Sequence, residues 1–423
     1  MEFRYRQYSL DGKRHGFLFM CSKGYGEDYH SLFYMPGCCI GKDELVEAAE
    51  YMKKALALAK IALGYTSPNP VVGCVIVKDG EIVGTGYHHQ AGAPHAEVLA
   101  LQEAGDRATG ATVYVTLEPC AHYGRTPPCA RTLVQHKIKK VVIAMLDPNP
   151  LVAGKGAAIL RQAGIVVEVG LLSAEAVKLN EVFIKNMLSN IPFIAIKLAQ
   201  SLDGCIATRT GHSQWITNAW SRQYGQYLRS IYDGILVGIN TILEDNPLLT
   251  CRVRREGQAV PHQPIRIVLD TYGRTPLSSQ VVNDKTARTI IMTTAQCPQE
   301  KKEALLAAGV TVLTAPTANT GCVDLHAALQ LLRQEGIGSI LVEGGSTIHG
   351  SFFDAKLVDK IYAFLGNSII GGTCALCSVA GEGVDGLEEC VPLHYDSIEI
   401  HDDNILIQAY NAAREGAYVH WNH

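Results

Sequence analysis

Hydrophobic residues recur at helical spacing once the chain passes residue 42. Asp43 can cap a helix that Gly64, a residue suited to closing helices, would end. The apolar stripe of this helix is formed by Val46, Met52, Leu56, Ala59 and Leu63. The spacing therefore predicts one amphipathic helix over this segment.

Strand-like and helix-like segments then alternate. Asp79 and Gly80 lie between two apolar runs and supply the positive φ angles that a tight hairpin turn needs. The expected elements are a hairpin at 71–88, a helix from about His95, and strands at 112–117 and 140–145. Strands alternating with helices predict an α/β layered domain.

This alternation pauses near residue 190. A long amphipathic segment, 173–188, ends shortly before Pro192, and proline disfavours helix at the residue before it. A buried-looking strand, 193–200, follows. Further strands are expected at Ile235 to Val237, Ile265 to Leu269, Thr289 to Met292, Ile340 to Val342 and Lys360 to Phe364. We therefore expect an N-terminal extension (1–42), a first α/β domain (43–189) and a second α/β domain (190–423).

The first 42 residues show no sustained periodicity, so we expect only weak structure there and assign no function. Their one apolar run, 16–21, is shorter than a signal-peptide core and far below the ~20 residues that cross a bilayer. We expect neither a targeting segment nor a membrane segment.

Composition narrows the choice of function. The chain of 423 residues is 47% hydrophobic and 18% charged, and its net charge of -4 gives no electrostatic reason to expect a nucleic-acid partner. Its 13 cysteines are odd in number and scattered, unlike the framework of a small disulfide-rich secreted domain. A cytoplasmic enzyme acting on a small molecule is expected.

Four residues of the first domain form a chemically meaningful group. His95 and Glu97 lie at the start of an expected helix, and Cys120 and Cys129 follow an expected strand. One imidazole and two thiolates would leave the fourth position of a zinc ion for water, whose pKa zinc lowers toward ~7. Glu97 would then move protons. The order H-x-E followed by P-C is typical of zinc deaminases.

Each part also has a simpler interpretation. His-Ala-Glu alone usually marks a solvated helix start, and a Pro-Cys pair is common. Their joint order at strand-to-helix junctions favours the metal site. The spacing departs from the usual deaminase pattern, because eight residues separate Cys120 from Cys129 where two are usual.

Three segments of the second domain, 196–217, 236–252 and 339–353, place small and polar residues at strand ends. In the last of them, Gly344 and Gly345 follow a strand and Ser346 can cap the next helix. Backbone N–H groups would then face an anionic ligand such as a dinucleotide pyrophosphate. A plain tight turn is the alternative interpretation.

The segments TLEPCAHYGRTPPCA (116–130) and AMLDPNPLVAGKG (144–156) resemble the deaminase half of the bifunctional riboflavin-biosynthesis deaminase/reductase family. The three strand-end segments resemble its reductase half, so the resemblance runs from about residue 45 to the C-terminal region. It implies a cytidine-deaminase-like three-layer α/β/α domain followed by a dihydrofolate-reductase-like α/β domain.

The resemblance also implies roles for residues. His95, Cys120 and Cys129 would bind zinc, and Glu97 would be the proton donor and acceptor. Asn69, His88, Asp147 and Asn149 would form the pyrimidine pocket, and His122 and Arg125 would reach the substrate phosphate. NADPH would contact Ala199, Trp215, Thr241, Asp245, Gly345, Ser346, Thr347, Ile348, His349, Gly350 and Ser351. The ribosyl phosphate would contact Ser213, Arg229, Leu249, Arg252 and Glu343, with the two arginines as a phosphate clamp, and Lys197 would assist at ribose C1.

Three cysteines receive no role at this point. Cys205 stands where members of the family commonly carry lysine, so nothing is carried over to it. Cys374 and Cys377 form a C-x-x-C, but no second pair or histidine lies at metal-binding spacing, which favours two reduced thiols in a loop.

The expected function is a bifunctional enzyme of riboflavin biosynthesis, dependent on zinc and NADPH, which forms a homo-oligomer and has no nucleic-acid or membrane partner. It would deaminate 2,5-diamino-6-ribosylamino-4(3H)-pyrimidinone 5′-phosphate and then reduce the ribosyl group to ribityl. Two alternatives stay open: a nucleoside or RNA-editing zinc deaminase with an appended ligand-binding domain, and a reductase or ligand-binding protein whose deaminase half has lost catalysis.

Overall fold

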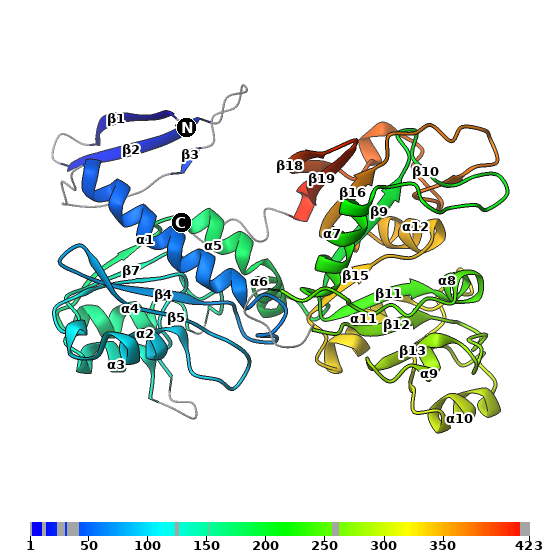
Figure 1. Cartoon of the computed structure of the whole chain (residues 1–423), viewed down its shortest axis with the longest axis horizontal. Coiled ribbons are helices and arrows are strands. Elements are labelled where there is room, and N and C mark those ends of the chain that lie inside the picture. The colour runs from blue at the N-terminus through cyan, green and yellow to red at the C-terminus, as the bar shows by residue number, and fades with distance from the viewer. Residues whose placement is uncertain are drawn as a thin grey trace.

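The computed structural model describes residues 2–10, 14–22, 30–31, 42–122, 127–150, 152–255 and 262–414. Two α/β bodies lie side by side, and α6 (Glu181–Leu188) lies at their junction (Figure 1). Each body is built on its own sheet. The predicted succession of two α/β units is confirmed.

The first body contains a five-stranded sheet of order β5-β4-β6-β7-β8. Its strands are β4 (Gly73–Lys78), β5 (Glu81–Tyr87), β6 (Thr112–Val115), β7 (Lys140–Ile143) and β8 (Val166–Val169). Its helices are α1 (Lys42–Ile61), α2 (Ala96–Ala104), α3 (Cys129–Gln135), α4 (Lys155–Gln162), α5 (Ser173–Leu179) and α6, with a 3-10 turn at Gly105–Ala108. The predicted hairpin is present, and Asp79 and Gly80 both have positive φ angles.

Alternation along the strands separates two layers of core in this body. On β6, Val113 and Val115 face the cluster that includes α2, α3 and α4, whereas Tyr114 faces the cluster that includes α1 and α5. The sheet is therefore covered on both faces, which is the expected three-layer α/β/α arrangement.

The second body contains a nine-stranded sheet of order β14-β13-β12-β11-β15-β9-β16-β19-β18. The strands are β9 (Phe193–Gln200), β11 (Gly234–Gly238), β12 (Ile265–Leu269), β13 (Thr289–Thr293), β14 (Thr311–Thr314), β15 (Ser339–Val342), β16 (Lys360–Leu365), β18 (Leu393–His401) and β19 (Asn404–Asn411). The helices are α7 (Ala219–Arg229), α8 (Ile239–Asp245), α9 (Gln280–Asn283), α10 (Gln299–Ala307), α11 (Leu325–Gln334) and α12 (Ser346–Asp354), with a 3-10 turn at Leu387–Glu389. A separate two-stranded ribbon pairs β10 (Cys205–Ala207) with β17 (Leu376–Cys377).

The strands from β14 to β16 run parallel, and β19 and β18 extend the sheet in antiparallel fashion. The carboxyl ends of β9, β11 and β15 therefore lie at one edge of the sheet. Ligands of open α/β sheets bind at this edge. The three strand-end segments singled out in the sequence come together there.

The expectation of weak structure before residue 43 is wrong for part of the extension. The strands β1 (Glu2–Leu10), β2 (Arg14–Ser22) and β3 (His30–Ser31) form a three-stranded antiparallel sheet. The pairing of β1 with β2 is continuous over nine residues on each strand. The strand signals here are short, because β1 alternates apolar and polar residues only at its start and β2 is a mostly apolar run.

Three expectations about helices are also corrected. Helix α1 begins at Lys42, so Asp43 lies in its first turn, and Val46 of the predicted stripe is 54% exposed. The predicted helix 173–188 is broken at Asn180, whose side chain bonds the backbone of Val71. Gly345, with a positive φ, is the N-cap of α12, so Ser346 is its first helical residue rather than its cap.

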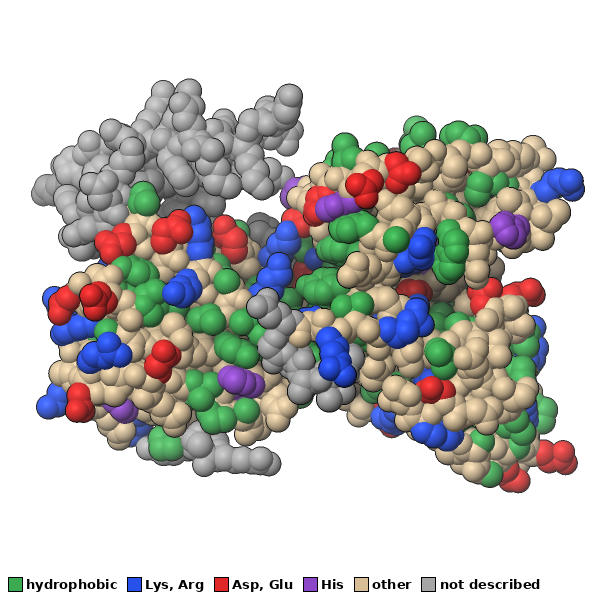
Figure 2. All heavy atoms as spheres, viewed as in Figure 1, with side chains coloured by type: hydrophobic (Ala, Val, Ile, Leu, Met, Phe, Trp, Pro, Cys, Tyr) green, Lys and Arg blue, Asp and Glu red, His purple; other side chains and the backbone are tan. Residues whose placement is uncertain are grey.

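In the part of the chain that is described, no helix has the length and apolar character needed to cross a membrane. Acidic and basic side chains are interspersed over the face seen in Figure 2. This face therefore presents no broad field of one sign.

Candidate functional site

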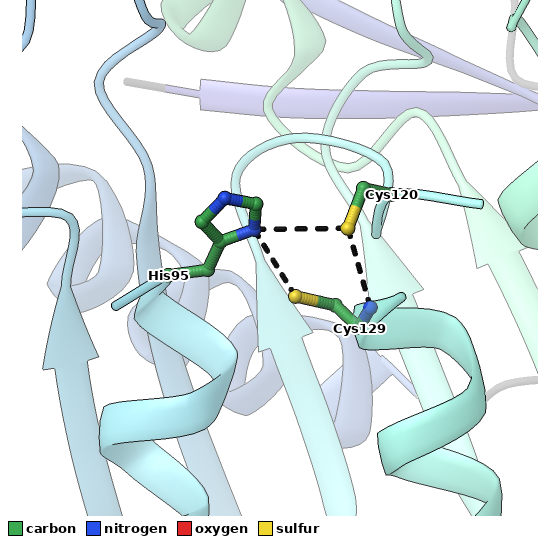
Figure 3. Close-up of side chains that lie close together, drawn as sticks. All are labelled: His95, Cys120 and Cys129. Carbon is green, nitrogen blue, oxygen red and sulfur yellow. Dashed lines mark hydrogen bonds between the residues drawn. The ribbon is translucent and has the colours of Figure 1, made fainter. Parts of the chain in front are cut away.

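Three separate elements bring the predicted zinc ligands together. His95 is the N-cap of α2, Cys120 lies in the loop after β6, and Cys129 is the first residue of α3. The His95 Nδ1 atom lies 3.2 Å from the Cys129 Sγ and 3.7 Å from the Cys120 Sγ (Figure 3). The backbone N–H of Cys129 donates to the Cys120 Sγ at 3.2 Å.

These distances fit a metal ion. Zinc with Zn–N and Zn–S bonds of about 2.0 and 2.3 Å in tetrahedral geometry places its N and S ligands roughly 3.6 Å apart. All three ligand atoms lie within 4.8 Å of one another. Contact with the Cys129 thiol lowers the pKa of Cys120, so the site offers a thiolate at neutral pH. The residues present therefore suit zinc, and no fourth side chain joins the group in the part of the chain that the structure describes.

Glu97 lies two residues beyond His95, in the first turn of α2, and is almost fully buried. Burial raises the pKa of its carboxyl group. Its charge interacts with His95 and with both cysteines. The structure thus places a carboxyl group of elevated pKa beside the three ligands, as proton transfer requires.

His88 and Asn69 form the next layer of this site. The His88 ring packs edge-on against the His95 ring, with centroids 5.6 Å apart. Its Nε2 lies 3.1 Å from the Asn69 amide nitrogen, and its Nδ1 lies 3.1 Å from the Pro94 carbonyl oxygen. Burial lowers the pKa of His88, so the ring is neutral, with Nδ1 donating to Pro94 and Nε2 accepting from Asn69.

Asp147 and Asn149 lie in the loop after β7, where the Asp147 carboxylate accepts the Asn149 N–H at 2.8 Å. Burial raises the pKa of Asp147.

The loop that carries Asp147 and Asn149 is held by Glu118, a buried residue that the sequence reasoning missed. Glu118 accepts the N–H groups of Asp147, Gly154 and Ala157 at 3.1, 2.9 and 3.0 Å. The sequence feature that could have identified Glu118 is its position directly before Pro119 and Cys120.

The two residues predicted to contact the substrate phosphate in the first site are His122 and Arg125. His122 is exposed, and its charge interacts with Asp147. Arg125 lies outside the described residues, so its predicted role stays a prediction.

A second group of polar residues lies in the nine-stranded body. The Arg229 guanidinium makes two bonds to the Glu343 carboxylate, at 2.7 and 2.9 Å, and a third to the Thr250 carbonyl at 3.1 Å. Burial raises the pKa of Glu343. The ion pair with Arg229 lowers it by more, so the pKa of Glu343 is below its ordinary value. Three of the five N–H donors of Arg229 are thus used within the protein, and its predicted part in a phosphate clamp stays a prediction.

Lys197 lies on β9 close to this ion pair. Burial lowers the pKa of its ammonium group, and the charges of Glu343 and Arg229 act on it in opposite directions. Its Nζ lies 5.9 Å from the centre of the Phe364 ring. A lysine with a lowered pKa beside a buried carboxylate is typical of a functional site.

The other predicted substrate residues are spread around this centre. Ser213 and Arg252 are exposed. Leu249 has a positive φ and a side chain buried in the core, so only its backbone is available to a ligand. Of the two predicted phosphate-binding arginines, Arg252 is the one on the surface.

The turn before α12 has the form expected of an anion site. Gly345 has a φ of +68°, and a side chain on Gly344 would come within 2.7 Å of Val237 on β11. The helix start thus approaches the sheet closely. The first N–H groups of a helix have no acceptor within it, and the dipole there favours negative charge.

The predicted NADPH residues of this turn differ in burial and form three groups. Gly345 and Thr347 are exposed, and Ser346, Ile348 and Ser351 are half-buried. His349 and Gly350 are buried: the His349 Nδ1 lies 2.9 Å from the Ser378 carbonyl oxygen. Among the described residues, the buried His349 Nε2 has no hydrogen-bond partner, and the ring interacts electrostatically with Lys197 and Glu343.

The remaining predicted cofactor residues lie on other elements. Ala199 is near the end of β9, and Thr241 and Asp245 lie on α8. The Thr241 hydroxyl would be 3.9 Å from a Cβ added at Gly345. Trp215 is 71% exposed, and the Arg222 guanidinium stacks over it at 4.4 Å from the ring centre.

Comparison with known proteins covers both bodies. Residues 46–145 match the family described as the cytidine and deoxycytidylate deaminase zinc-binding region, and residues 192–402 match the RibD C-terminal domain. The riboflavin biosynthesis protein RibD of Bacillus amyloliquefaciens is 43% identical over 373 residues, which cover 88% of this chain and 99% of that protein. The corresponding protein of Escherichia coli strain K12 is 44% identical over 340 residues, 78% of this chain and 91% of its own length.

Solved structures agree with these matches. Acinetobacter baumannii RibD superimposes with a TM-score of 0.77 at 39% identity and covers 87% of this chain and 99% of that chain. A diaminohydroxyphosphoribosylaminopyrimidine deaminase/5-amino-6-(5-phosphoribosylamino)uracil reductase from Thermotoga maritima gives a TM-score of 0.75 at 35% identity, with the same coverage. The expected succession of a cytidine-deaminase-like domain and a reductase domain is thereby confirmed.

Proposed function

The chain belongs to the RibD family of bifunctional riboflavin-biosynthesis enzymes, and from this premise we propose which of its residues carry the two reactions. The chain is a zinc-dependent deaminase and an NADPH-dependent reductase. It hydrolyses the 2-amino group of 2,5-diamino-6-ribosylamino-4(3H)-pyrimidinone 5′-phosphate and then reduces the ribosyl side chain to ribityl. A nucleic-acid deaminase with an unrelated appended domain is not favoured, because the second half matches the RibD C-terminal domain.

In the deaminase site, His95, Cys120 and Cys129 hold zinc. The observation that carries this assignment is the meeting of one imidazole and two sulfurs from three separate elements. Zinc in such a site supplies the Lewis acidity that makes water nucleophilic at neutral pH. Glu97 takes a proton from the attacking water and delivers it to the leaving ammonia, a role suited to its raised pKa.

The pyrimidine pocket is formed by Asn69, His88, Asp147 and Asn149. The neutral His88 ring keeps the Asn69 amide directed at it, which fixes one side of the pocket. The Asp147 and Asn149 loop forms another side. His122 and Arg125 belong to the loop between the two cysteines and bind the substrate phosphate.

In the reductase site, NADPH supplies the hydride for C1 of the open-chain imine or aldehyde form of the ribosyl group. The Lys197 ammonium donates to the heteroatom bonded to C1. Glu343, held in place by Arg229, keeps Lys197 positioned. Arg252, Ser213 and the Leu249 backbone bind the ribosyl phosphate.

The N–H groups that follow Gly345, in the turn before α12, would hold the pyrophosphate of the cofactor. The contacting residues are Ala199, Trp215, Thr241, Asp245 and the exposed part of the Gly345–Ser351 segment. The close approach of this helix start to β11 and the positive φ of Gly345 support this assignment.

The variant Glu97→Gln tests the division of labour. Glutamine keeps the shape of the side chain but cannot take a proton, so deamination should fall by at least about 10²-fold while zinc content and reduction of supplied deaminated substrate stay unchanged. Glu103→Gln, an exposed position on the same helix, is the matched control. Loss of both activities in a folded, zinc-loaded Glu97→Gln protein contradicts the two-site assignment.

We also propose that the chain forms a homo-oligomer and works in the cytoplasm, with the domain division near residue 190. The edge strand β18 supports self-association, because Ile398 and Ile400 are 60% and 73% exposed on one face, together with Leu393 and Tyr395. The ten cysteines from Cys74 onward are all free thiols, in keeping with a reducing compartment.

Light scattering after size exclusion tests self-association. The wild type should elute as an oligomer, and the double variant Ile398→Lys, Ile400→Lys should have a lower mass. A monomeric wild type would refute this part of the proposal.

A further inference from the structure

We propose that Cys205 and Cys377 are a built-in oxidation site, at which a disulfide forms between the two strands of the small ribbon β10 and β17. The strands are antiparallel, and Cys205 is the direct partner of Cys377; the register shifts only after this pair, between Cys205 and Ala207. Both cysteines are free thiols in the structure. Neither belongs to the zinc site or to the residues assigned to catalysis.

The backbone register makes this pair suitable for a disulfide. The Ser378 N–H donates to the Gly204 carbonyl at 2.9 Å, so a hydrogen bond joins the two residues that flank the pair. Cys205 and Cys377 thus occupy a non-hydrogen-bonded position, where Cα atoms lie about 4.5 Å apart and the side chains share a face. Disulfides join Cα atoms about 4.4–6.8 Å apart. The bond therefore requires little displacement of the backbone.

Exposure sets the order of the chemical steps. Cys377 is exposed, whereas Cys205 is buried with its Sγ 3.7 Å from a carboxylate oxygen of Asp203. The Cys377 thiolate attacks oxidised glutathione, a low-molecular-weight disulfide, and one glutathione thiolate leaves. The Cys205 thiolate then attacks the Cys377 sulfur and releases the second. The two protein thiols lose two electrons and two protons, and one oxidised glutathione becomes two reduced molecules.

The competing pair is Cys374 with Cys377, which are only three residues apart. Cys374 lies in the turn before β17, outside the two paired strands of the ribbon. Its approach to Cys377 would require the turn to change shape, whereas the ribbon already holds Cys205 opposite Cys377. The geometry therefore favours the cross-strand bond.

The segment directly after β17 contacts the first turns of α12. Ser378 accepts a bond at its carbonyl from His349, and the Ala380 N–H donates to the Ser346 carbonyl at 3.1 Å. A side chain on Gly350 would come within 1.7 Å of the Ala380 carbonyl oxygen, so the two segments are in close contact. A disulfide would hold this support in the observed arrangement. This expectation rests on the proposed NADPH site: oxidation should preorganise the turn before α12 that would hold the cofactor.

Disulfide mapping tests the bond itself without reference to activity. The reduced, zinc-loaded full chain is incubated with oxidised glutathione, free thiols are alkylated, and the peptides are identified by mass spectrometry. A linked Cys205–Cys377 peptide pair is expected in the wild type and in the control Cys374→Ser. Cys205→Ser should stop at a glutathione adduct on Cys377. A Cys374–Cys377 bond, or glutathione adducts alone in the wild type, would overturn the proposal.

Kinetics of the fully linked protein test the consequence. The KM for NADPH should fall by about twofold or more, return on reduction with dithiothreitol, and stay constant in oxidised Cys377→Ser, with deamination unchanged throughout. An unchanged KM in linked protein that still reduces its substrate would overturn the coupling to the cofactor turn. Absence of any reduction before oxidation would instead refute the proposed function.

Discussion

At the residue scale, Glu118 connects a proposed zinc ligand, Cys120, to the loop proposed to form the pyrimidine pocket. Its carboxylate accepts three backbone N–H groups of the loop and helix that follow β7, and Cys120 is two residues further along its own chain. A Cβ added at Gly156 would come within 2.0 Å of the Pro119 carbonyl oxygen. The loop that carries Asp147 and Asn149 is therefore fixed to the segment that carries a zinc ligand.

The variant Glu118→Gln tests this role as a positioning residue. An amide offers one acceptor atom where the carboxylate offers two, so at least one buried N–H loses its partner, at a cost of about 1–3 kcal/mol. We expect kcat/KM for deamination to fall about tenfold or more, mainly through KM, while reduction stays unchanged. Glu81→Gln, an exposed position at the start of β5, is the control. An unaltered KM would contradict the positioning role.

Lys197 gives a prediction about pH. Burial lowers its pKa below the ordinary lysine value of about 10.4. A lysine is protonated below its pKa, so the ammonium is lost as pH rises through this lowered value, and reduction should fall on the alkaline side at a pH below 10.4. The Lys197→Arg variant stays charged over this range, so its alkaline limb should move to higher pH. The measurement is kcat/KM for deaminated substrate against pH, and an unmoved limb contradicts the role of Lys197.

At the scale of elements, Asn180 explains why the single helix predicted at 173–188 is divided into α5 and α6. Its side chain accepts the Val71 N–H at 2.9 Å and donates to the Val71 carbonyl at 3.1 Å. These bonds tie the break between α5 and α6 to the segment before β4. The amphipathic pattern of residues 173–188 continues through Asn180. The pattern therefore gave no indication that the helix is broken there.

Replacement of Asn180 by alanine should reduce the free energy of unfolding by about 1–3 kcal/mol, because two buried backbone groups of Val71 lose their partners. Asn190→Ala, at an exposed position, is the matched control and should have little effect. Denaturant unfolding of both variants checks this. Equal stability of the two variants would mean that Asn180 does not hold the break.

Features determined by neighbouring residues could be predicted from the sequence, whereas pairings between distant residues could not. The meeting of His95, Cys120 and Cys129 could be predicted because short motifs at strand-to-helix junctions determine it, and the hairpin could be predicted from Asp79 and Gly80. The pairing of Arg229 with Glu343 joins residues 114 positions apart, and no local pattern indicates it. The three-stranded sheet before residue 32 was missed, although alternating Phe3 and Tyr5 and the Asp11-Gly12 pair were available as strand and turn signals.

At the scale of the whole molecule, the two bodies meet through specific contacts. Arg255 donates to the Ile61 and Lys60 carbonyls at 2.8 and 3.2 Å and also bonds the Leu63 carbonyl. It thereby caps the last turn of α1 from the other body. Gly64 lies against the backbone of Ser230, where an added Cβ would be only 2.3 Å from the carbonyl oxygen. A residue of the second body thus helps to complete a helix of the first.

Removal of this contact should uncouple the bodies. Arg255→Ala should lower the melting temperature of the first body, at a cost of about 1 kcal/mol, and broaden or split the unfolding transition. The adjacent Arg254 is exposed, and Arg254→Ala is the control. Both activities at saturating substrate should persist at low temperature. A transition identical to that of the control would show that Arg255 does not couple the bodies.

The central claim is that one chain carries two successive reactions at two sites. The most direct measurement supplies the purified, zinc-loaded protein with 2,5-diamino-6-ribosylamino-4(3H)-pyrimidinone 5′-phosphate and NADPH, and follows ammonia release and NADPH oxidation in parallel. Ammonia should appear first, and NADPH should be consumed only as deaminated product forms. Ammonia release without NADPH oxidation, or neither signal from folded protein with stoichiometric zinc, would contradict the account.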